Sequence, residues 1–263
     1  MRTKIQINPA FAEVEGFMKS LPATFNDKGV TLKNDRNEIK IIKYGELKLC
    51  VKSFNRVTVF NRYMYSWFRS TKAKRSYKTA LRLKKKNINT PAPIGYVEVY
   101  SNWGVLQKAF YVSLYLEYDY DMADILDKNI AKQEVILTDF AQYMAQVVHP
   151  AGAWHHDLSP GNVLINKIDD EEWSFSFIDL NRMEFRRDIS SFRGLSNLKK
   201  MTNQPVALSL MAEQYALVSK RNPQIFSFLL IRDNFIFAFR RFYRKKILHV
   251  FKTKKESVKD AKE

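Results

Sequence analysis

The chain has 263 residues, of which 46% are hydrophobic and 14% aromatic, so it can bury the core of one large domain or of two small lobes. Its net charge of +17 predicts an anionic partner: nucleic acid, an anionic membrane surface or a phosphorylated substrate. The single cysteine, Cys50, excludes an internal disulfide, and the four scattered histidines lack zinc-ligand spacing.

Targeting and membrane-spanning segments are not expected. No apolar run is long enough for a transmembrane helix, and the first residues lack the apolar core of a signal peptide. We therefore expect an intracellular protein that does not span a membrane.

The N-terminal part of the chain predicts an antiparallel sheet with one helix. Residues 29–33, 37–43 and 47–54 read as three strands separated by polar turns. A basic helix is expected from 61 to 86, and it should end before the Thr90-Pro91 stop signal.

Two more strands, 94–100 and 109–116, complete the predicted sheet, and the acidic segment 117–121 interrupts the pattern after them. We place the lobe boundary there. The expected lobes are 1–117 and 118–263, and the second should end in a basic helix.

The second lobe reads as mainly helical. Ile136, Phe140, Met144 and Val147 recur at helical spacing. Two short strands, 163–165 and 175–178, then flank an acidic turn, and residues from 187 onward read as helix, with a frayed tail from Thr253. The predicted fold class is α+β with two lobes.

The segment from His155 to Asn162, followed by Asp179, carries the clearest chemical signal. Phosphoryl transfer needs an oriented hydroxyl and metal-assisted neutralisation of charge on the phosphates. Asp157 would accept the proton of the hydroxyl, Asn162 and Asp179 would hold Mg²⁺, and His155 would brace the loop. The competing interpretation is an ordinary turn, because every residue from Asp157 to Asn162 is turn-prone.

This pattern resembles the catalytic loop and metal-binding segment of the protein-kinase superfamily. The resemblance implies a two-lobed kinase-like fold that uses ATP and Mg²⁺, in which the lobe 1–117 would bind ATP and the lobe 118–263 would carry the catalytic loop. It also implies that Lys52, at the end of the third strand, contacts the α- and β-phosphates. By analogy of fold, Glu117 and Tyr118 would contact adenine. A lysine on a strand is otherwise an ordinary solvated residue.

Two features depart from that superfamily. The turn between the first two strands contains no glycine, and no Asp or Glu lies between Lys52 and Glu98. Ser76 stands where the helix should offer a glutamate to Lys52. The chain is therefore either an active kinase with a rewired site or a pseudokinase that binds without turnover. The intact set of Asp157, Asn162 and Asp179 favours activity.

A narrower resemblance is to the bacterial lipopolysaccharide core kinases, the heptose and Kdo kinases. Five segments carry it: Val51–Phe54, Lys72–Ser76, Ile88–Gly95, His155–Asn162 and Ile178–Arg182. It implies that ATP phosphorylates a sugar hydroxyl of the lipid A and inner-core precursor, an anionic glycolipid, at the cytoplasmic face of the inner membrane. Ser159, where protein kinases usually carry lysine, argues against a protein substrate.

Two basic segments could contact an anionic membrane: residues 69–86 and residues 240–252. In the second, the alternative is that Phe235, Phe239 and Phe242 pack onto the lobe while the cations stay solvated.

Other functions remain open. A nucleic-acid-binding protein would suit the charge, but no binding motif is present, so no nucleic-acid partner is expected. A pseudokinase scaffold, a serine/threonine protein kinase and a small-molecule kinase are the remaining alternatives; a soluble aminoglycoside-like acceptor fits the +17 charge poorly.

Overall fold

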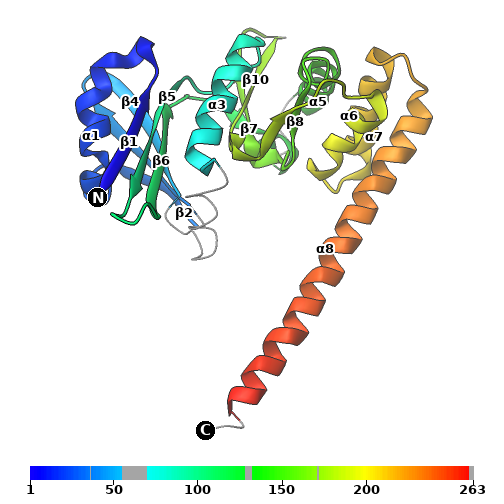
Figure 1. The fold of residues 1–263 in the computed structure, drawn as a ribbon. Coiled ribbons are helices and arrows are strands. Elements are labelled where there is room, and N and C mark those ends of the chain that lie inside the picture. The colour runs from blue at the N-terminus through cyan, green and yellow to red at the C-terminus, as the bar shows by residue number, and fades with distance from the viewer. Residues whose placement is uncertain (36, 55–69, 128–131, 171, 261–263) are drawn as a thin grey trace. The chain divides into compact units, whose positions relative to one another are not determined.

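The computed structural model describes residues 1–35, 37–54, 70–127, 132–170 and 172–260. The chain divides into two compact units (Figure 1). One contains Met1–Asp121 and Asn162–Glu184, and the other contains Met122–Gly161 and Phe185–Glu263. The division differs from the expected one at 117, because β9 (Val163–Lys167) pairs with the short strand β7 (Tyr120–Asp121) and so belongs with the N-terminal part of the chain.

Within the described residues, the first unit contains a six-stranded antiparallel sheet in the order β1-β5-β6-β4-β3-β2. Its strands are β1 (Arg2–Ile7), β2 (Val30–Asn34), β3 (Glu38–Tyr44), β4 (Leu47–Ser53), β5 (Pro93–Tyr100) and β6 (Leu106–Leu114). The predicted meander and the two later strands are confirmed, although β6 begins and ends earlier than expected. Burial alternates along β4, whereas β2 at the edge is exposed throughout and β5 is buried on both faces, as expected for an inner strand of a sheet with two covered faces.

The first strand, β1, was not expected from the sequence. It pairs antiparallel with β5, and Ile7 lies opposite Gly95. A Cβ atom on Gly95 would lie 2.2 Å from the carbonyl oxygen of Gln6, so glycine is needed for the two strands to approach.

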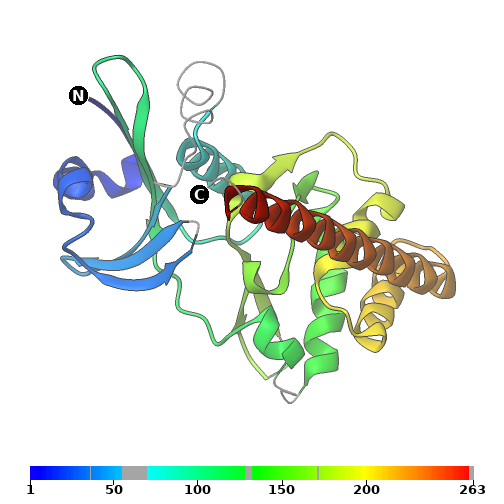
Figure 2. The same cartoon turned by 90° about the horizontal axis from the view of Figure 1, so that it is seen from below.

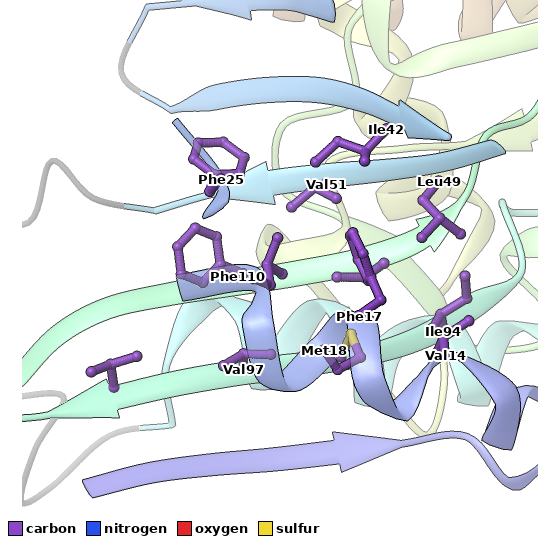
Figure 3. Close-up of a cluster of buried hydrophobic side chains, with 13 residues drawn as sticks. Val14, Phe17, Met18, Phe25, Ile42, Leu49, Val51, Ile94, Val97 and Phe110 are labelled. Carbon is purple, nitrogen blue, oxygen red and sulfur yellow. The ribbon is translucent and has the colours of Figure 1, made fainter. Parts of the chain in front are cut away.

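Two helices cover opposite faces of this sheet (Figure 1). Helix α1 (Glu15–Thr24), which follows a 3-10 turn over Pro9–Val14, is additional to the one helix expected in this part of the chain. Its Phe17 and Met18 point into a buried apolar cluster with Val51, Val97 and Phe110 of the sheet (Figure 3). Burying these side chains is the main driving force for packing α1 onto the sheet.

Helix α3 (Lys72–Lys85) lies on the other face, where the rings of Tyr77 and Tyr96 are 5.6 Å apart. It begins at Lys72 because the Thr71 side chain accepts a hydrogen bond from the backbone N–H of Lys74, which caps the helix. A continuous helix from residue 61 was predicted. This prediction is wrong at residues 70 and 71, which are not helical. Positions 61–69 lie outside the described residues.

The hairpin of β9 and β10 (Trp173–Phe177) completes the first unit, followed by a 3-10 turn over Leu180–Arg182. Backbone hydrogen bonds tie this hairpin to the segment before β5. Thr90 Oγ1 donates to the carbonyl of Phe177 at 2.8 Å, and the N–H of Phe177 donates to the carbonyl of Asn89 at 3.0 Å. The strand β11 (Met183–Phe185) then leads out of the unit.

The second unit is mainly helical, as predicted. Its elements are α4 (Met122–Asp127), α5 (Gln133–Tyr143), a π-helical turn (Met144–Val148), the strand β8 (Ala153–His155), α6 (Ser191–Asn197), a 3-10 turn (Leu198–Lys200), α7 (Pro205–Val218) and α8 (Pro223–Asp260). The π-helical turn rotates the end of the predicted amphipathic helix, so Val148 is buried where Val147 was expected to be.

The first part of the long helix α8 lies beside α7 (Figure 2). Phe226 and Leu230 of this part are buried. Phe235, Phe239 and Phe242 are 67%, 51% and 60% exposed, so the alternative that they pack onto the lobe is wrong. The helix continues to Asp260, past Thr253, from which the tail was expected to fray, and positions 261–263 lie outside the described residues.

Among the residues that the structure describes, no helix combines the length and the apolar character that crossing a membrane requires.

Candidate functional site

The first unit brings together Lys52 of β4 and Asp179, which follows β10. The Lys52 Nζ lies 2.5 Å from the Asp179 Oδ1, and the two side chains are 14% and 27% exposed. The same oxygen accepts a hydrogen bond from the Asn181 amide at 2.5 Å. The two residues that sequence analysis assigned to phosphate and metal therefore form a direct, partly buried ion pair.

Asp179 occupies an unusual backbone conformation, with φ of 56° and ψ of 45°. This left-handed region disfavours most side chains but is better tolerated by Asp and Asn. The conformation turns the chain sharply at the end of β10. Such local strain is characteristic of residues whose placement serves a site.

Asn162 lies beside this turn because of the hairpin register. Val163 pairs with Phe177, and the backbone N–H of Ile178 donates to the carbonyl of Asn162 at 3.1 Å. Asn162 and Asp179 therefore flank the open end of one hairpin. An amide oxygen and a carboxylate oxygen are ligands suited to Mg²⁺, which usually binds through one or two protein groups together with water and phosphate.

The described residues contain no cluster of three or more His, Cys, Asp or Glu side chains that would hold a metal without such additional ligands.

A second lysine, Lys72, joins this site from the first turn of α3. Its Nζ lies 5.9 Å from the Phe54 ring centroid, and the Lys52 Nζ lies 5.6 Å from the same centroid. Burial lowers the pKa of Lys72 and Arg182 lowers it further, whereas Asp179 opposes them. The cations outnumber the carboxylate, which suits a polyphosphate. Sequence analysis placed Lys72 in a family-like segment but gave it no role.

Helix α3 offers no carboxylate to Lys52, and the structure pairs this lysine with Asp179. Ser76 is buried on α3, as is Glu98 on β5. The Glu98 carboxylate accepts hydrogen bonds from Thr71 Oγ1 at 2.5 Å and from the Tyr100 hydroxyl at 3.0 Å, so it supports the start of α3. The orientation of Lys52 comes from its contact with Asp179.

The two residues expected at adenine lie in the segment before β7. The Glu117 carboxylate pairs with Lys48 at 2.9 Å, which lowers the pKa of Glu117, and its carbonyl accepts a hydrogen bond from the Asn166 amide at 2.9 Å. Tyr118 is 42% exposed. The adenine contact of both residues stays a prediction.

The second unit carries Asp157 in the loop after β8. The backbone N–H of Asp157 donates to the His155 Nδ1 at 3.1 Å, and His155 is only 1% exposed. This hydrogen bond is compatible with a bracing role of His155, which stays a prediction. The Lys200 Nζ donates to the Asp157 Oδ1 at 3.1 Å and to the carbonyl of His156 at 2.9 Å. Sequence analysis missed Lys200, because no local pattern links it to the loop.

A buried network anchors this loop to the helices. The Asn197 amide nitrogen donates to the His155 carbonyl at 2.8 Å, so its oxygen is free to accept from the His149 Nε2 at 3.3 Å. The His149 Nδ1 lies 2.8 Å from the Tyr215 hydroxyl. This pattern fits a neutral imidazole that carries its proton on Nε2. Gly194 leaves room for it, because a Cβ there would lie 1.9 Å from the Tyr215 hydroxyl oxygen.

We expect this network to make folding sensitive to mild acid. Burial lowers the pKa of His149 from 6.5 to about 4. Between these values the unfolded chain binds a proton that the folded chain does not, so stability is lost as pH falls from 6.5 to 4. The shift corresponds to a loss of about 3 kcal/mol. Chemical denaturation at several pH values measures it. In His149→Gln the pH slope should be shallower, and an unchanged slope would assign acid sensitivity to other groups.

Comparison with known proteins identifies the family and the fold. The sequence model of the lipopolysaccharide kinase (Kdo/WaaP) family matches residues 42–220. Comparison with curated proteins gives no match. Among solved structures, WaaP in complex with acyl carrier protein has a TM-score of 0.59 at 15% identity, over 89% of this chain and 96% of that chain. This likeness confirms the predicted kinase-like α+β fold.

Two further structures are similar at lower scores. WbdD has a TM-score of 0.43 at 15% identity, over 76% of this chain and 44% of that chain. The MAP kinase LmaMPK10 from Leishmania major has a TM-score of 0.41 at 17% identity, over 76% and 60%. Because the family match extends over more than half of the sequence, the chain belongs to the lipopolysaccharide kinase (Kdo/WaaP) family.

Proposed function

We propose that the protein transfers the γ-phosphoryl group of ATP to a hydroxyl of a Kdo or heptose residue in the lipopolysaccharide inner core. Membership of the family supports the reaction class. The observation that carries the proposal is the ion pair of Lys52 with Asp179 at the end of the hairpin that also bears Asn162. These are the groups that phosphoryl transfer requires on the nucleotide side.

Each residue has a distinct role in the proposed reaction. Asp157 accepts the proton of the acceptor hydroxyl while the oxygen of that hydroxyl forms a bond to the γ-phosphorus. The bond from that phosphorus to the β,γ-bridging oxygen breaks, and its electron pair leaves on ADP. Lys52 binds the α- and β-phosphates. Asn162 and Asp179 would hold Mg²⁺, which would neutralise charge on the phosphates.

The pseudokinase alternative rested on the absent helix carboxylate opposite Lys52. Asp179 supplies a carboxylate to that lysine in the structure, and His155 and Lys200 both contact the loop of Asp157. A defined lysine and a braced base support turnover. A serine/threonine protein kinase stays the second alternative. The test below distinguishes it from a glycolipid kinase by which acceptor, peptide or glycolipid, gains the phosphate.

The test is ATP turnover with purified acceptors: Kdo-lipid A, its heptosylated form and a basic peptide mixture. We expect Mg²⁺-dependent ADP release and an added phosphate on one glycolipid, with no labelled peptide. The sugar that gains the phosphate, located by mass spectrometry, separates Kdo from heptose. Binding of Mg-ATP without turnover on either glycolipid would favour a pseudokinase.

We further propose that the protein works at the cytoplasmic face of the inner membrane and contacts it through α8. Exposed aromatic residues recur along this helix at heptad-like spacing: Phe228, Phe235, Phe239 and Phe242. Arg240, Arg241 and Arg244 are also exposed on this part of α8. Aromatic side chains enter the boundary between headgroups and acyl chains, and cations near them bind anionic lipid.

Replacing Phe235, Phe239 and Phe242 together with serine should weaken binding to vesicles of phosphatidylglycerol and phosphatidylethanolamine. Each partly inserted ring contributes on the order of 1 kcal/mol, so the loss should reach about a hundredfold. Vesicle co-sedimentation measures it. The control replaces two exposed apolar residues elsewhere in the same unit, Val206 and Leu217, with serine. Equal vesicle binding of both variants would remove α8 from the membrane contact.

A further inference from the structure

The second unit contains a cavity of about 350 Å³ beside the loop of Asp157. The 3-10 turn before α7, the segment that follows it, α8 and the end of the catalytic loop all contribute to its wall. The residues that matter for its chemistry are Pro160, Lys200, Thr202, Asn203, Gln204 and Arg241. Its volume lies in the range of cavities that bind small molecules, and a monosaccharide fits within it.

Lys200 connects this cavity to the proposed general base. Its Nζ lies 3.1 Å from the Asp157 Oδ1, and its side chain is 23% exposed. The same nitrogen lies 5.3 Å from the ring centroid of Phe237, which also lines the cavity. With its hydrogen bond to the carbonyl of His156, the Lys200 Nζ makes three separate contacts, which hold it between the Asp157 carboxylate and the cavity.

The backbone around Lys200 is fixed by α8. The Asn234 amide nitrogen donates to the carbonyls of Lys199 and Thr202 at 2.8 Å each, and Asn234 is only 8% exposed. A buried amide that binds on both sides of Lys200 limits how far this lysine can move. The fold of the second unit therefore fixes the position of the Lys200 Nζ.

The cavity offers two cations to an anionic ligand, Lys200 and Arg241. Two carboxylates lie near them: Asp127, which also lines the cavity, and Asp157, which pairs with Lys200, so an anion would share Lys200 with Asp157. The hydroxyl of Thr202 and the amides of Asn203 and Gln204 add neutral hydrogen-bonding groups, which suit the hydroxyls of a sugar. Ser159 leaves the catalytic loop itself without a lysine, so the cation beside Asp157 comes from a distant part of the chain.

We propose that this cavity is the acceptor subsite, and that it takes a sugar carrying a carboxylate or phosphate group, bound by Lys200 and Arg241. This inference rests on the proposed function, since it assigns the second substrate of the same reaction. Binding of the anion by Lys200 sets the sugar beside Asp157, so one hydroxyl of the acceptor meets the base. A neutral sugar lacks this anchor.

The experiment is an NMR titration of the full chain without ATP, which detects millimolar affinity. The probes are Kdo, Kdo methyl ester and glucose 6-phosphate. The variants are Lys200→Met and Arg241→Met, and the matched controls are Lys199→Met and Arg240→Met. Lys199 donates to Ser196 at 3.2 Å, Arg240 is exposed, and neither lines the cavity.

We expect at least one of the two anionic probes to bind the wild type, and each cavity variant to weaken it by about tenfold, the usual effect of removing one charged hydrogen-bond partner. The controls should stay close to wild type, and Kdo methyl ester should bind weakly throughout. Binding of Kdo but not glucose 6-phosphate identifies a carboxylate ligand, and the reverse identifies a phosphate.

Three results would overturn the inference: no binding of either anionic probe to the wild type, binding of Kdo that its methyl ester equals, or cavity variants that match their controls. Arg241 is exposed on a helix, so Arg241→Met keeps the fold and the comparison stays valid if Lys200→Met does not fold. Because the titration contains no ATP, a failure of phosphoryl transfer leaves its result unaffected, and the two proposals fail separately.

Discussion

Asp157→Ala should abolish phosphoryl transfer, lowering kcat by about a thousandfold or more, because the variant has no base for the acceptor hydroxyl. The substitution changes little in the fold. Asp157 lies in a loop, and its lost contact with Lys200 is a partly exposed ion pair worth about 1 kcal/mol or less. Lys200 keeps its hydrogen bond to the carbonyl of His156.

The assay is acceptor-dependent ADP release, with thermal unfolding measured in parallel. Asp188→Ala is the control, since Asp188 is an exposed aspartate of the same unit. Asp157→Asn gives a second comparison, because it keeps the size of the side chain and removes its basicity. Wild-type turnover in either Asp157 variant would exclude this residue as the base.

Asp179→Asn should eliminate turnover by a different route, with a loss of kcat of at least about a thousandfold. Asparagine tolerates the left-handed backbone at this position, whereas alanine would add strain there. The asparagine variant therefore isolates the charge. It removes the carboxylate that contacts Lys52 and that would bind metal.

Nucleotide affinity, measured with a fluorescent ATP analogue, distinguishes the loss of metal binding expected for Asp179→Asn from the loss of the general base in Asp157→Ala. In Asp179→Asn, adding Mg²⁺ should no longer tighten nucleotide binding, whereas Asp157→Ala should respond like the wild type. Asp170→Asn, in the exposed turn of the same hairpin, is the matched control. A normal Mg²⁺ response in Asp179→Asn would remove Asp179 from the metal site.

The local parts of the site were predictable from sequence. Asp157, Asn162 and Asp179 are set by a turn-prone loop and a short hairpin, and both depend on residues close together in the chain. The strands β3 and β4 were equally clear, because polar turns separate them. Such features need no knowledge of distant contacts.

The distant contacts were not predictable. β1 pairs with β5, which lies more than eighty residues later in the chain, and the periodicity of the sequence does not indicate this pairing. Lys200 reaches Asp157 only because Asn234 holds its backbone from α8, and one sequence offers no sign of that hydrogen bond. The start of α3 depended on a side-chain cap at Thr71 within an otherwise helix-compatible run.

The aromatic residues of α8 illustrate a different limit. Their spacing is compatible both with packing onto a lobe and with an exposed surface, since either face needs the same heptad-like pattern. Only the path of the helix past α7 distinguishes them. The buried residue on the same stretch is Asn234, which a hydropathy pattern would place outside.

The ion pair between Lys52 and Asp179 would also couple two affinities, if Asp179 binds metal and Lys52 binds phosphate as proposed. A metal ion at the Asp179 Oδ1 would compete with Lys52 for this oxygen, and phosphate would compete with Asp179 for the lysine. Each ligand would then remove a competitor of the other. By reciprocity, the factor by which metal raises nucleotide affinity would equal the factor by which nucleotide raises metal affinity. We therefore expect metal and nucleotide to bind cooperatively.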